Sequence, residues 1–269
     1  MPGLFSMIRL NTITLAGIAV LVGWLLAGIF NPVLLVMGII SALLIAGAGN
    51  IINDYFDVET DKINRPKRAI PSGHVRRNLA LKFYLALTIM GWVISYFVSF
   101  GFFLIASVNI VISFLYSWKL KPVALVGNAA VSYLSASSFL AGSLIALTFT
   151  EAVKTPILIL AIIGFLGTMA REIMKDVEDV KGDKKSGART FPIIFSEIKA
   201  KILSYMFLAA GILILALNIS SITYLVGTII AGAVSLYAIC LYNNPGKSQR
   251  IMKVVMYIII ITFLLTIIL

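Results

Sequence analysis

Nine of the eleven acidic residues in this 269-residue chain lie in two short segments. Within each segment, three acids are separated by three and then four positions, a spacing that puts their side chains on one face of a helix. Corresponding acids of the two sets lie 122 positions apart, as the difference between 176 and 54 illustrates. The two sets are Asp54, Asp57 and Asp61, and Asp176, Asp179 and Asp183.

Three carboxylates on one helical face repel one another and need a compensating cation. Carboxylate oxygens without His or Cys suit Mg²⁺, which usually shares its remaining positions with a substrate phosphate. Basic residues follow each set and can bind free phosphate oxygens. These residues are Lys62, Arg65, Lys67, Arg68, Lys184 and Arg189. We therefore predict that the two acidic faces, with Asn50 at the edge of the first, bind a diphosphate through Mg²⁺.

The segments that must position these residues are strongly apolar. The chain is 60% hydrophobic and only 12% charged, which is unusual for a soluble domain. Nine apolar stretches each approach the roughly 20 residues that cross a bilayer as a helix. They cover residues 12–30, 33–52, 79–99, 102–118, 123–148, 156–175, 199–218, 221–242 and 252–269. We therefore predict an all-α polytopic membrane protein with nine transmembrane helices in one integral-membrane domain, residues 1–269.

The basic residues indicate how these helices are oriented. If the nine helices alternate in direction, the Lys and Arg residues gather on one side, and Lys154 is the clear exception. Cytoplasmic loops retain such residues. We therefore predict a multi-pass protein of the cell membrane, with the N-terminus and the acidic segments cytoplasmic and the C-terminus outside. The formal net charge of +11 then reflects topology, and no nucleic-acid partner is expected.

The matched spacing also indicates an internal repeat. Both acidic segments end helices that run inward, so we predict a pseudo-repeated bundle in which the two acidic faces look at each other. A plainer interpretation treats both segments as solvated loop ends. Finding the same spacing twice on one side favours a shared site. We interpret His74, the only His, as a solvated loop residue, and Cys240, the only Cys, as a small buried side chain.

Both segments resemble the Asp-rich motifs of the UbiA superfamily of intramembrane prenyltransferases. The first motif reads Asn53-Asp54-x-x-Asp57-x-x-x-Asp61, and Asn64-Arg65-Pro66 and RAIPSG at 68–73 follow it. The second motif reads REIMKDVEDVKGDKKSGARTFP at 171–192. The resemblance covers the whole chain, because that family has nine transmembrane helices and carries its motifs after the second and the sixth.

The resemblance implies a prenyl diphosphate held by Mg²⁺ between the two motifs, with its tail in a lateral tunnel open to membrane lipid. It implies that the residues which bind metal or diphosphate are Asn53, Asp57, Asp61, Asp179 and Asp183. Asp54 and Asp176 are expected to join them. A third family feature, Tyr-x-x-x-Lys, is absent at that spacing. Tyr116 with Lys119 or Lys121 matches it in part, and Lys119 is equally well explained as a topological charge.

Three other polar residues are candidates for the site. Asn128 is costly in lipid and is expected to point into the bundle. Arg171 and Lys175 are either substrate ligands or ion-pair partners of Glu172 and Asp179, and the ligand role is favoured for Arg171 because it is set deepest in its apolar stretch.

The acceptor is the least determined part of the prediction. The two motifs are most similar to those of archaeal enzymes that add a second geranylgeranyl chain to geranylgeranylglyceryl phosphate. Such a phosphorylated acceptor would use the additional basic residues of loops 62–77 and 180–201. Aromatic or chlorophyll-type acceptors are the alternative, because RAIPSG also occurs in those branches.

Two other classes of protein also place acids on membrane helices. A transporter would carry them at the middle of the membrane, whereas here they lie at one edge. A CDP-alcohol phosphotransferase would carry an Asp-Gly-x-x-Ala-Arg signature, which this sequence lacks. Both classes are therefore less consistent with the sequence than a prenyltransferase.

Overall fold

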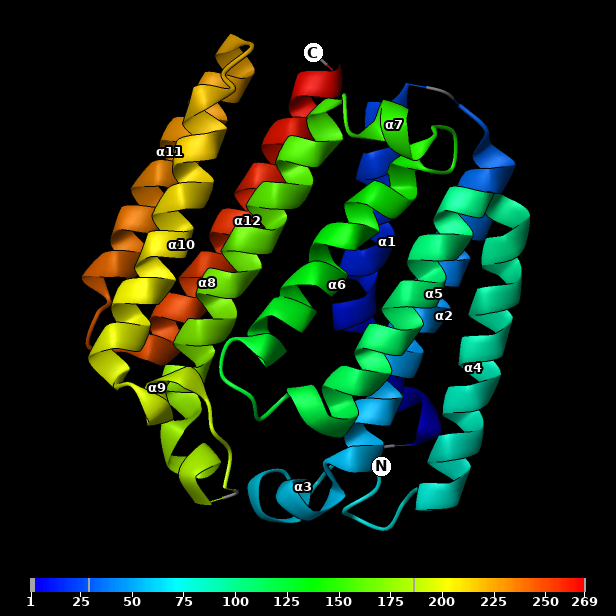
Figure 1. The fold of residues 1–269 in the computed structure, drawn as a ribbon, viewed down its shortest axis with the longest axis vertical. Coiled ribbons are helices and arrows are strands. Elements are labelled where there is room, and N and C mark those ends of the chain that lie inside the picture. Colours follow the sequence, from blue (N-terminus) through cyan, green and yellow to red (C-terminus); the bar gives the residue numbers. More distant parts are fainter. Residues whose placement is uncertain (1–2, 29, 186, 269) are drawn as a thin grey trace. The chain divides into compact units, whose positions relative to one another are not determined.

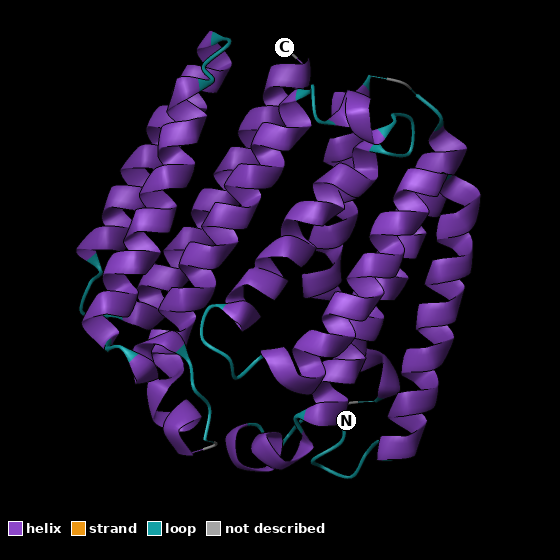
Figure 2. Ribbon diagram, viewed as in Figure 1, coloured by secondary structure: helices purple, strands orange, loops and turns teal. Residues whose placement is uncertain are grey.

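The computed structural model describes residues 3–28, 30–185 and 187–268, and every regular element in these ranges is helical (Figure 2). In chain order the elements are η1 (Leu4–Ile8), α1 (Leu10–Ala27), α2 (Pro32–Phe56), α3 (Val58–Asn64), α4 (Arg77–Val98), α5 (Phe100–Leu115), η2 (Tyr116–Leu120), α6 (Val126–Ser143), α7 (Phe149–Ala152), α8 (Pro156–Lys185), α9 (Phe191–Ile194), α10 (Glu197–Leu217), α11 (Ile222–Cys240) and α12 (Pro245–Ile268). The prediction of an all-α protein is confirmed.

Seven helical segments in the described ranges are long and apolar enough to cross a membrane. They are Pro32–Phe56, Arg77–Val98, Phe100–Leu120, Pro156–Lys185, Glu197–Leu217, Ile222–Cys240 and Pro245–Thr266. The other two predicted stretches are also helical. One is α1, whose apolar part Ile13–Ala27 is shorter, and the other is α6, which carries five serines and Asn128. The chain is therefore a multi-pass membrane protein, and the predicted count of nine is approximate.

Helices α2 and α5 begin with side-chain caps at gaps between the predicted apolar stretches. Asn31 precedes α2, and its side chain accepts a hydrogen bond from the backbone N–H of Leu34, with Pro32 in the first turn. Ser99 caps α5 in the same way, by accepting from Phe102. One prediction is wrong here. Cys240, the last residue of α11, is exposed rather than buried, like Leu236 and Tyr237 before it.

The chain divides into two compact units, and Figure 1 allows the helices of each to be followed by colour. Unit 1 comprises Met1–Lys121 and Ser137–Ile157, and unit 2 comprises Pro122–Ala136 and Leu158–Leu269. The helix order of the two units repeats with the 122-residue offset of the acids. The first residues of α5 and α11, at 100 and 222, differ by that number, and those of α4 and α10 differ by 120. The predicted repeat is therefore visible in the order of the helices.

Within unit 1, α2 is the central helix and packs against α1, α4 and α5. Gly91 of α4 allows a close contact with α2, because a Cβ there would lie 2.8 Å from Ile45 Cγ1. The buried Ser41 hydroxyl of α2 donates to the Gly91 carbonyl at 2.7 Å. Apolar contacts and one buried hydrogen bond therefore fix the helix that ends in the first acidic set.

Within unit 2, α8 is anchored to α10 and α12. The Ser204 hydroxyl of α10 donates to the Ala170 carbonyl of α8 at 2.6 Å. Near the start of α12, Gln249 donates to the Glu178 carboxylate at 3.2 Å, and a Cβ on Gly246 would lie 2.4 Å from that carboxylate. A carboxylate beside a helix N-terminus is electrostatically favourable. These contacts hold the helix that carries the second acidic set.

Close packing of α1 on α6 generates a testable prediction. A Cβ on Gly142 would lie 2.1 Å from the Val20 carbonyl oxygen, so Gly142→Ala forces the two helices apart. We expect the free energy of unfolding to fall by about 1–3 kcal/mol, as overpacking does elsewhere. The measurement is the apparent melting temperature of the purified protein in detergent. Gly232→Ala is the control, because the nearest side-chain atom that its Cβ would meet, Ile212 Cγ2, lies 4.0 Å away. Equal melting temperatures for the two variants would contradict the packing argument.

Candidate active site

The first acidic set spans a break between two helices rather than one continuous helix. α2 ends at Phe56, Asp57 has φ −80° and ψ 4°, and α3 begins at Val58. The backbone N–H of Asp57 still donates to Asn53, and that of Asp61 to Asp57, at 3.0 and 2.8 Å. The set therefore stays on one face, but the chain bends at its middle acid.

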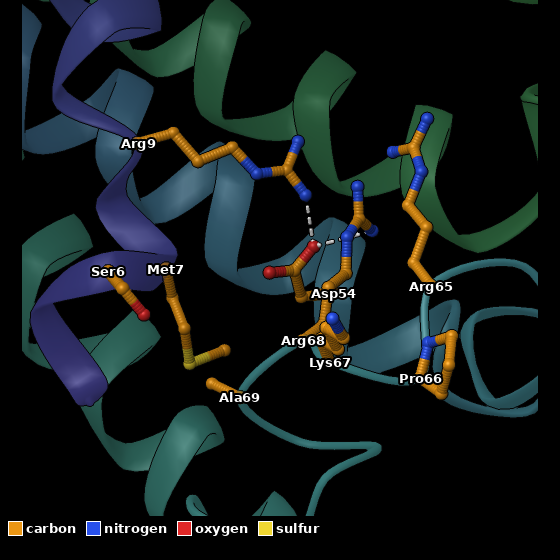
Figure 3. A pocket seen from close by; sticks show the side chains of 9 residues that line it. All are labelled: Ser6, Met7, Arg9, Asp54, Arg65, Pro66, Lys67, Arg68 and Ala69. Atoms are coloured by element: carbon orange, nitrogen blue, oxygen red, sulfur yellow. Dashed lines mark hydrogen bonds and ion pairs between the residues drawn. The ribbon is translucent and has the colours of Figure 1, made fainter. Parts of the chain in front are cut away.

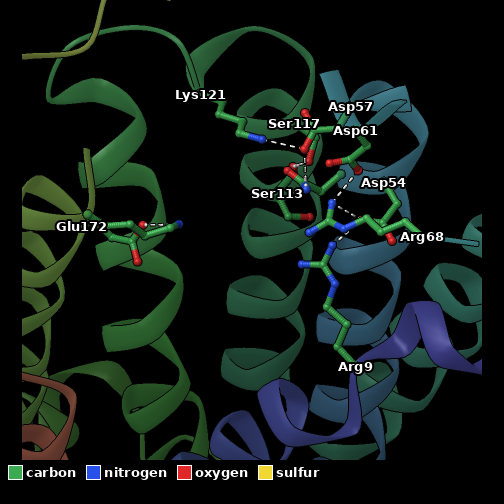
Figure 4. A network of polar contacts seen from close by, with 11 residues as sticks. Arg9, Asp54, Asp57, Asp61, Arg68, Ser113, Ser117, Lys121 and Glu172 are labelled. Carbon is green, nitrogen blue, oxygen red and sulfur yellow. Dashed lines mark hydrogen bonds and ion pairs between the residues drawn. The ribbon is translucent and has the colours of Figure 1, made fainter. Parts of the chain in front are cut away.

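Asp54 is the most constrained member of the set. It is 5% exposed and accepts from the guanidinium groups of Arg9 and Arg68, the latter at 3.1 Å. Arg68 also donates to Asp61 at 2.5 Å, and Asp61 is equally buried. Figure 4 shows Arg9 and Arg68 reaching Asp54 from different segments. Because a buried carboxylate is costly without a positive partner, this network joins the N-terminal segment, α2, α3 and the turn after α3.

Arg9 was missed by sequence reasoning, although a signal existed. It is the only charged residue among the first 53 of the chain, and Asp54 is the next. Arg9 lies between η1 and α1 with a positive φ of 55°. Burial lowers its pKa from the ordinary value, Asp54 opposes this shift, and the positive charges of Arg68 and Arg65 reinforce it. Arg9 is thus a partly desolvated cation beside other cations.

Asp57 has a different set of partners from Asp54. Its Oδ2 accepts from Lys121 Nζ at 2.5 Å and from Asn53 Nδ2 at 2.8 Å (Figure 4). Asn50, which the sequence placed at the edge of this face, donates instead to the Ile8 carbonyl at 2.8 Å and so holds η1 against α2. The structure brings Asn53 to the acids and engages Asn50 in packing.

Of the two lysines that the sequence left open, Lys121 is the one that contacts the first acidic set. Residues Tyr116–Leu120 form a π-helix, and the backbone N–H of Lys121 donates to the Tyr116 carbonyl at 3.0 Å. One added residue in a π-turn puts position i+5 where i+4 lies in an α-helix. Lys119 instead lies over the Trp118 ring, 4.1 Å from its centroid. The departure from Tyr-x-x-x-Lys is therefore compensated by the backbone.

A pocket of about 470 Å³ adjoins Asp54 within unit 1 (Figure 3). It lies between η1 and the turn after α3. Its lining residues are Ser6, Met7, Arg9, Asp54, Arg65, Pro66, Lys67, Arg68 and Ala69. The predicted residues Arg65 and Arg68 thus share one cavity with Arg9.

The second acidic set lies on one unbroken helix, α8. Asp176 accepts from Asn128 at 2.8 Å, so Asn128 is directed at an acid as expected. Asp179 is exposed, and Asp183 is partly buried. Lys184 and the side chain of Arg189 are exposed, while the Arg189 backbone N–H donates to Pro122 at 2.9 Å.

Arg171 and Lys175 both pair with Glu172. The Arg171 guanidinium contacts one Glu172 oxygen, and Lys175 Nζ lies 3.3 Å from the other. Glu172 is 6% exposed, so it requires such cations. Both residues therefore form ion pairs with Glu172, and a role as substrate ligands stays a prediction.

In the described residues, the carboxylates of the two acidic sets that have side-chain partners contact cationic or amide groups, and they do not form a cluster of carboxylates. No group of three or more His, Cys, Asp or Glu side chains arranged to hold a metal ion occurs among the described residues. The ligand chemistry nevertheless fits a hard cation, since Asp57 and Asp61 each keep one oxygen that accepts no hydrogen bond from another described residue. The role of these residues in metal binding stays a prediction.

Comparison with known proteins identifies the class. The UbiA prenyltransferase family matches residues 16–263 of this chain. The chain is 36% identical over 273 residues to digeranylgeranylglyceryl phosphate synthase of Pyrococcus furiosus, an alignment that covers 97% of this chain and 96% of that protein. The chain therefore belongs to the UbiA prenyltransferase family. The prediction of a membrane enzyme that transfers prenyl groups is confirmed at the level of the family.

Solved structures agree with this fold. A structure of digeranylgeranylglyceryl phosphate synthase has a TM-score of 0.81 and 29% identity, with 97% of this chain and 96% of that chain covered. A UbiA homologue from Archaeoglobus fulgidus, bound to GPP and Mg²⁺, has a TM-score of 0.74 and 17% identity, with 99% of each chain covered. The second likeness concerns the fold alone.

The two-carboxylate network around Arg68 yields a prediction about stability. Arg68→Met leaves Asp54 and Asp61 short of positive charge, and we expect the free energy of unfolding to fall by about 2–3 kcal/mol. Adding Asp61→Asn should restore part of this loss, because an amide needs no counter-charge. Melting temperatures of the wild type, both single variants and the double variant form the required cycle. Strictly additive effects would show that Arg68 and Asp61 are not coupled.

Proposed function

We propose that this protein transfers a geranylgeranyl group from its diphosphate to geranylgeranylglyceryl phosphate, in a reaction that requires Mg²⁺. The observation that carries the proposal is the 36% identity, over 97% of the chain, to a protein named digeranylgeranylglyceryl phosphate synthase. A solved structure of such a synthase, 29% identical to this chain, supports the same assignment. Aromatic and chlorophyll-type acceptors are less consistent with these relatives.

We assign the binding of Mg²⁺ and diphosphate to the two acidic sets together. Asp57 and Asp61, with Asn53, come from the first set, and Asp179 and Asp183 from the second. The open oxygens of Asp57 and Asp61 and the lack of His or Cys nearby support a hard, oxygen-bound cation. When bound, Mg²⁺ would neutralise charge on the departing diphosphate. The UbiA homologue from Archaeoglobus fulgidus was solved with both GPP and Mg²⁺.

The chain's own residues then have separable roles. The bond between the prenyl C1 and the diphosphate oxygen breaks, and the acceptor hydroxyl oxygen bonds to C1 and releases its proton. Lys121 and Asn53 hold Asp57 in place and supply donors toward the leaving oxygen, whose growing negative charge they stabilise. The apolar helices keep water away from the allylic cation. The prenyl tail would lie in a lateral tunnel open to membrane lipid.

The distribution of basic residues supports a cytoplasmic site. Loops 62–77 and 180–201, which follow the two acidic sets, are rich in Lys and Arg. Such loops remain on the cytoplasmic side. We therefore assign the N-terminus and the site to the cytoplasm and the C-terminus to the outside of the cell membrane.

An assay of the purified protein tests the proposed function. With geranylgeranyl diphosphate, Mg²⁺ and geranylgeranylglyceryl phosphate, we expect a product carrying two geranylgeranyl chains, identified by its mass. Asp57→Ala and Asp179→Ala should each abolish turnover with an unchanged melting temperature, because each removes an assigned metal ligand. Glu197→Gln, at the start of α10, is the matched control. Prenylation of an aromatic acid instead would refute the acceptor, and full activity in both Asp variants would refute the metal assignment.

The π-turn leads to a separate prediction about two neighbouring lysines. Lys121→Met should lower kcat by about 100-fold or more, because it removes a charge-assisted bond at the proposed leaving group. Lys119→Met should change kcat by less than about threefold, since this lysine contacts only Trp118 among the described residues. The measurement is the rate of diphosphate release for the two variants at saturating substrates. A larger loss of kcat in Lys119→Met than in Lys121→Met would instead assign the contact with the leaving group to Lys119.

A further inference from the structure

The pocket beside Asp54 carries an excess of positive charge. Of its lining residues, Arg9, Arg65, Lys67 and Arg68 are basic and Asp54 alone is acidic, which leaves a formal charge of +3. Figure 3 shows the guanidinium groups of Arg9, Arg68 and Arg65 along one side of the pocket, with the Asp54 carboxylate next to the first two. Like charges held this close repel one another, so the pocket is electrostatically suited to an anion.

Two of these cations lack a partner in the described part of the chain. Arg9 and Arg68 share Asp54, and Arg68 also binds Asp61. Arg65 and Lys67 are exposed at the pocket and form no ion pair or side-chain hydrogen bond with any described residue. Their charges are therefore available to a ligand, while those of Arg9 and Arg68 hold the wall in place.

The rest of the lining strengthens the interaction with an anion. Met7 and Ala69, which also line the pocket, are 2% and 3% exposed. Apolar walls lower the local dielectric, and the burial that lowers the pKa of Arg9 reflects the same environment. A phosphate oxygen placed here would exchange water for guanidinium and ammonium donors in a charge-assisted bond.

The chemistry of the pocket differs from that of a metal-bound diphosphate site. A diphosphate bound through Mg²⁺ needs carboxylate oxygens that are open to the metal. The only carboxylate in the pocket, Asp54, is already neutralised by two guanidinium groups. An anion in this pocket would therefore be bound directly by cations. A phosphate monoester, with a charge of about −1.5 to −2 near neutral pH, matches the two positive charges of Arg65 and Lys67, since Arg9 and Arg68 are paired with Asp54 and Asp61.

We propose that this pocket binds the phosphate monoester of the acceptor, with Arg65 and Lys67 as its direct ligands. Arg68 links the pocket to the first acidic set, since one guanidinium nitrogen contacts both Asp54 and Asp61. The acceptor phosphate would thus be held next to, but separate from, the proposed site of the donor diphosphate. This inference rests on the proposed function, because that function requires a phosphorylated acceptor.

Direct binding is the first test. Inorganic phosphate, titrated into the purified full-length protein in detergent without Mg²⁺, should bind, and the double variant Arg65→Gln with Lys67→Gln should raise its Kd by at least tenfold. Lys82→Gln, which removes one exposed charge on α4 away from the pocket, should leave Kd within twofold. Equal phosphate affinity in the wild type and the double variant would overturn the assignment.

Kinetics then identify the source of the phosphate. The double variant should raise KM for geranylgeranylglyceryl phosphate at least tenfold and leave KM for geranylgeranyl diphosphate within twofold. A rise in KM for the donor instead would place the donor diphosphate in this pocket and overturn the proposal. If the wild type binds inorganic phosphate but forms no product from the phosphorylated acceptor, the proposed function fails. If the wild type forms product from the phosphorylated acceptor, and the double variant forms the same product with unchanged KM values, the proposed function stands and the pocket assignment fails.

Discussion

Neutralisation of buried carboxylates is the constraint on which the described site depends. Asp54, near the end of the apolar helix α2, and Asp61, in α3, are each 5% exposed, and an unpaired charge is costly when it is buried. Their cations come from opposite directions along the chain, Arg9 from before α1 and Arg68 from after α3. Meeting this one electrostatic requirement therefore draws the N-terminal segment and the turn after α3 onto α2, and it forms the wall of the basic pocket.

Two local departures from regular α-helix lie at the contact between the first acidic set and Lys121. The chain bends at Asp57, between α2 and α3, and η2 contains a π-turn that ends before Lys121. A straight helix would leave the lysine one position out of register with Tyr116. Irregular backbone of this kind is tolerated near functional sites, where surrounding packing enforces it. In this protein α2 is held by α1, α4 and α5, which supply that packing.

The two acidic sets share a spacing but not an environment. The first is surrounded by guanidinium and ammonium groups, whereas Asp176 of the second accepts from the Asn128 amide and Asp179 is exposed. A duplicated helix order thus carries two chemically distinct halves. The surroundings of the first set are electrostatically suited to anionic groups, whereas those of the second are not enriched in such cations around Asp176 and Asp179.

The sequence by itself determined the helical class, the membrane character and the two acidic motifs, because hydrophobic length and residue spacing are local properties. It also indicated Asn128, whose polarity in an apolar stretch required a partner. Only the tertiary structure decided that Arg9 contacts Asp54 and that Lys121, rather than Lys119, contacts Asp57. It also decided that Arg171 and Lys175 pair with Glu172. The contacts of Arg9 with Asp54 and of Lys121 with Asp57 depend on which distant groups the fold brings within about 3 Å of an acid, and the spacing of residues along the chain does not encode that proximity.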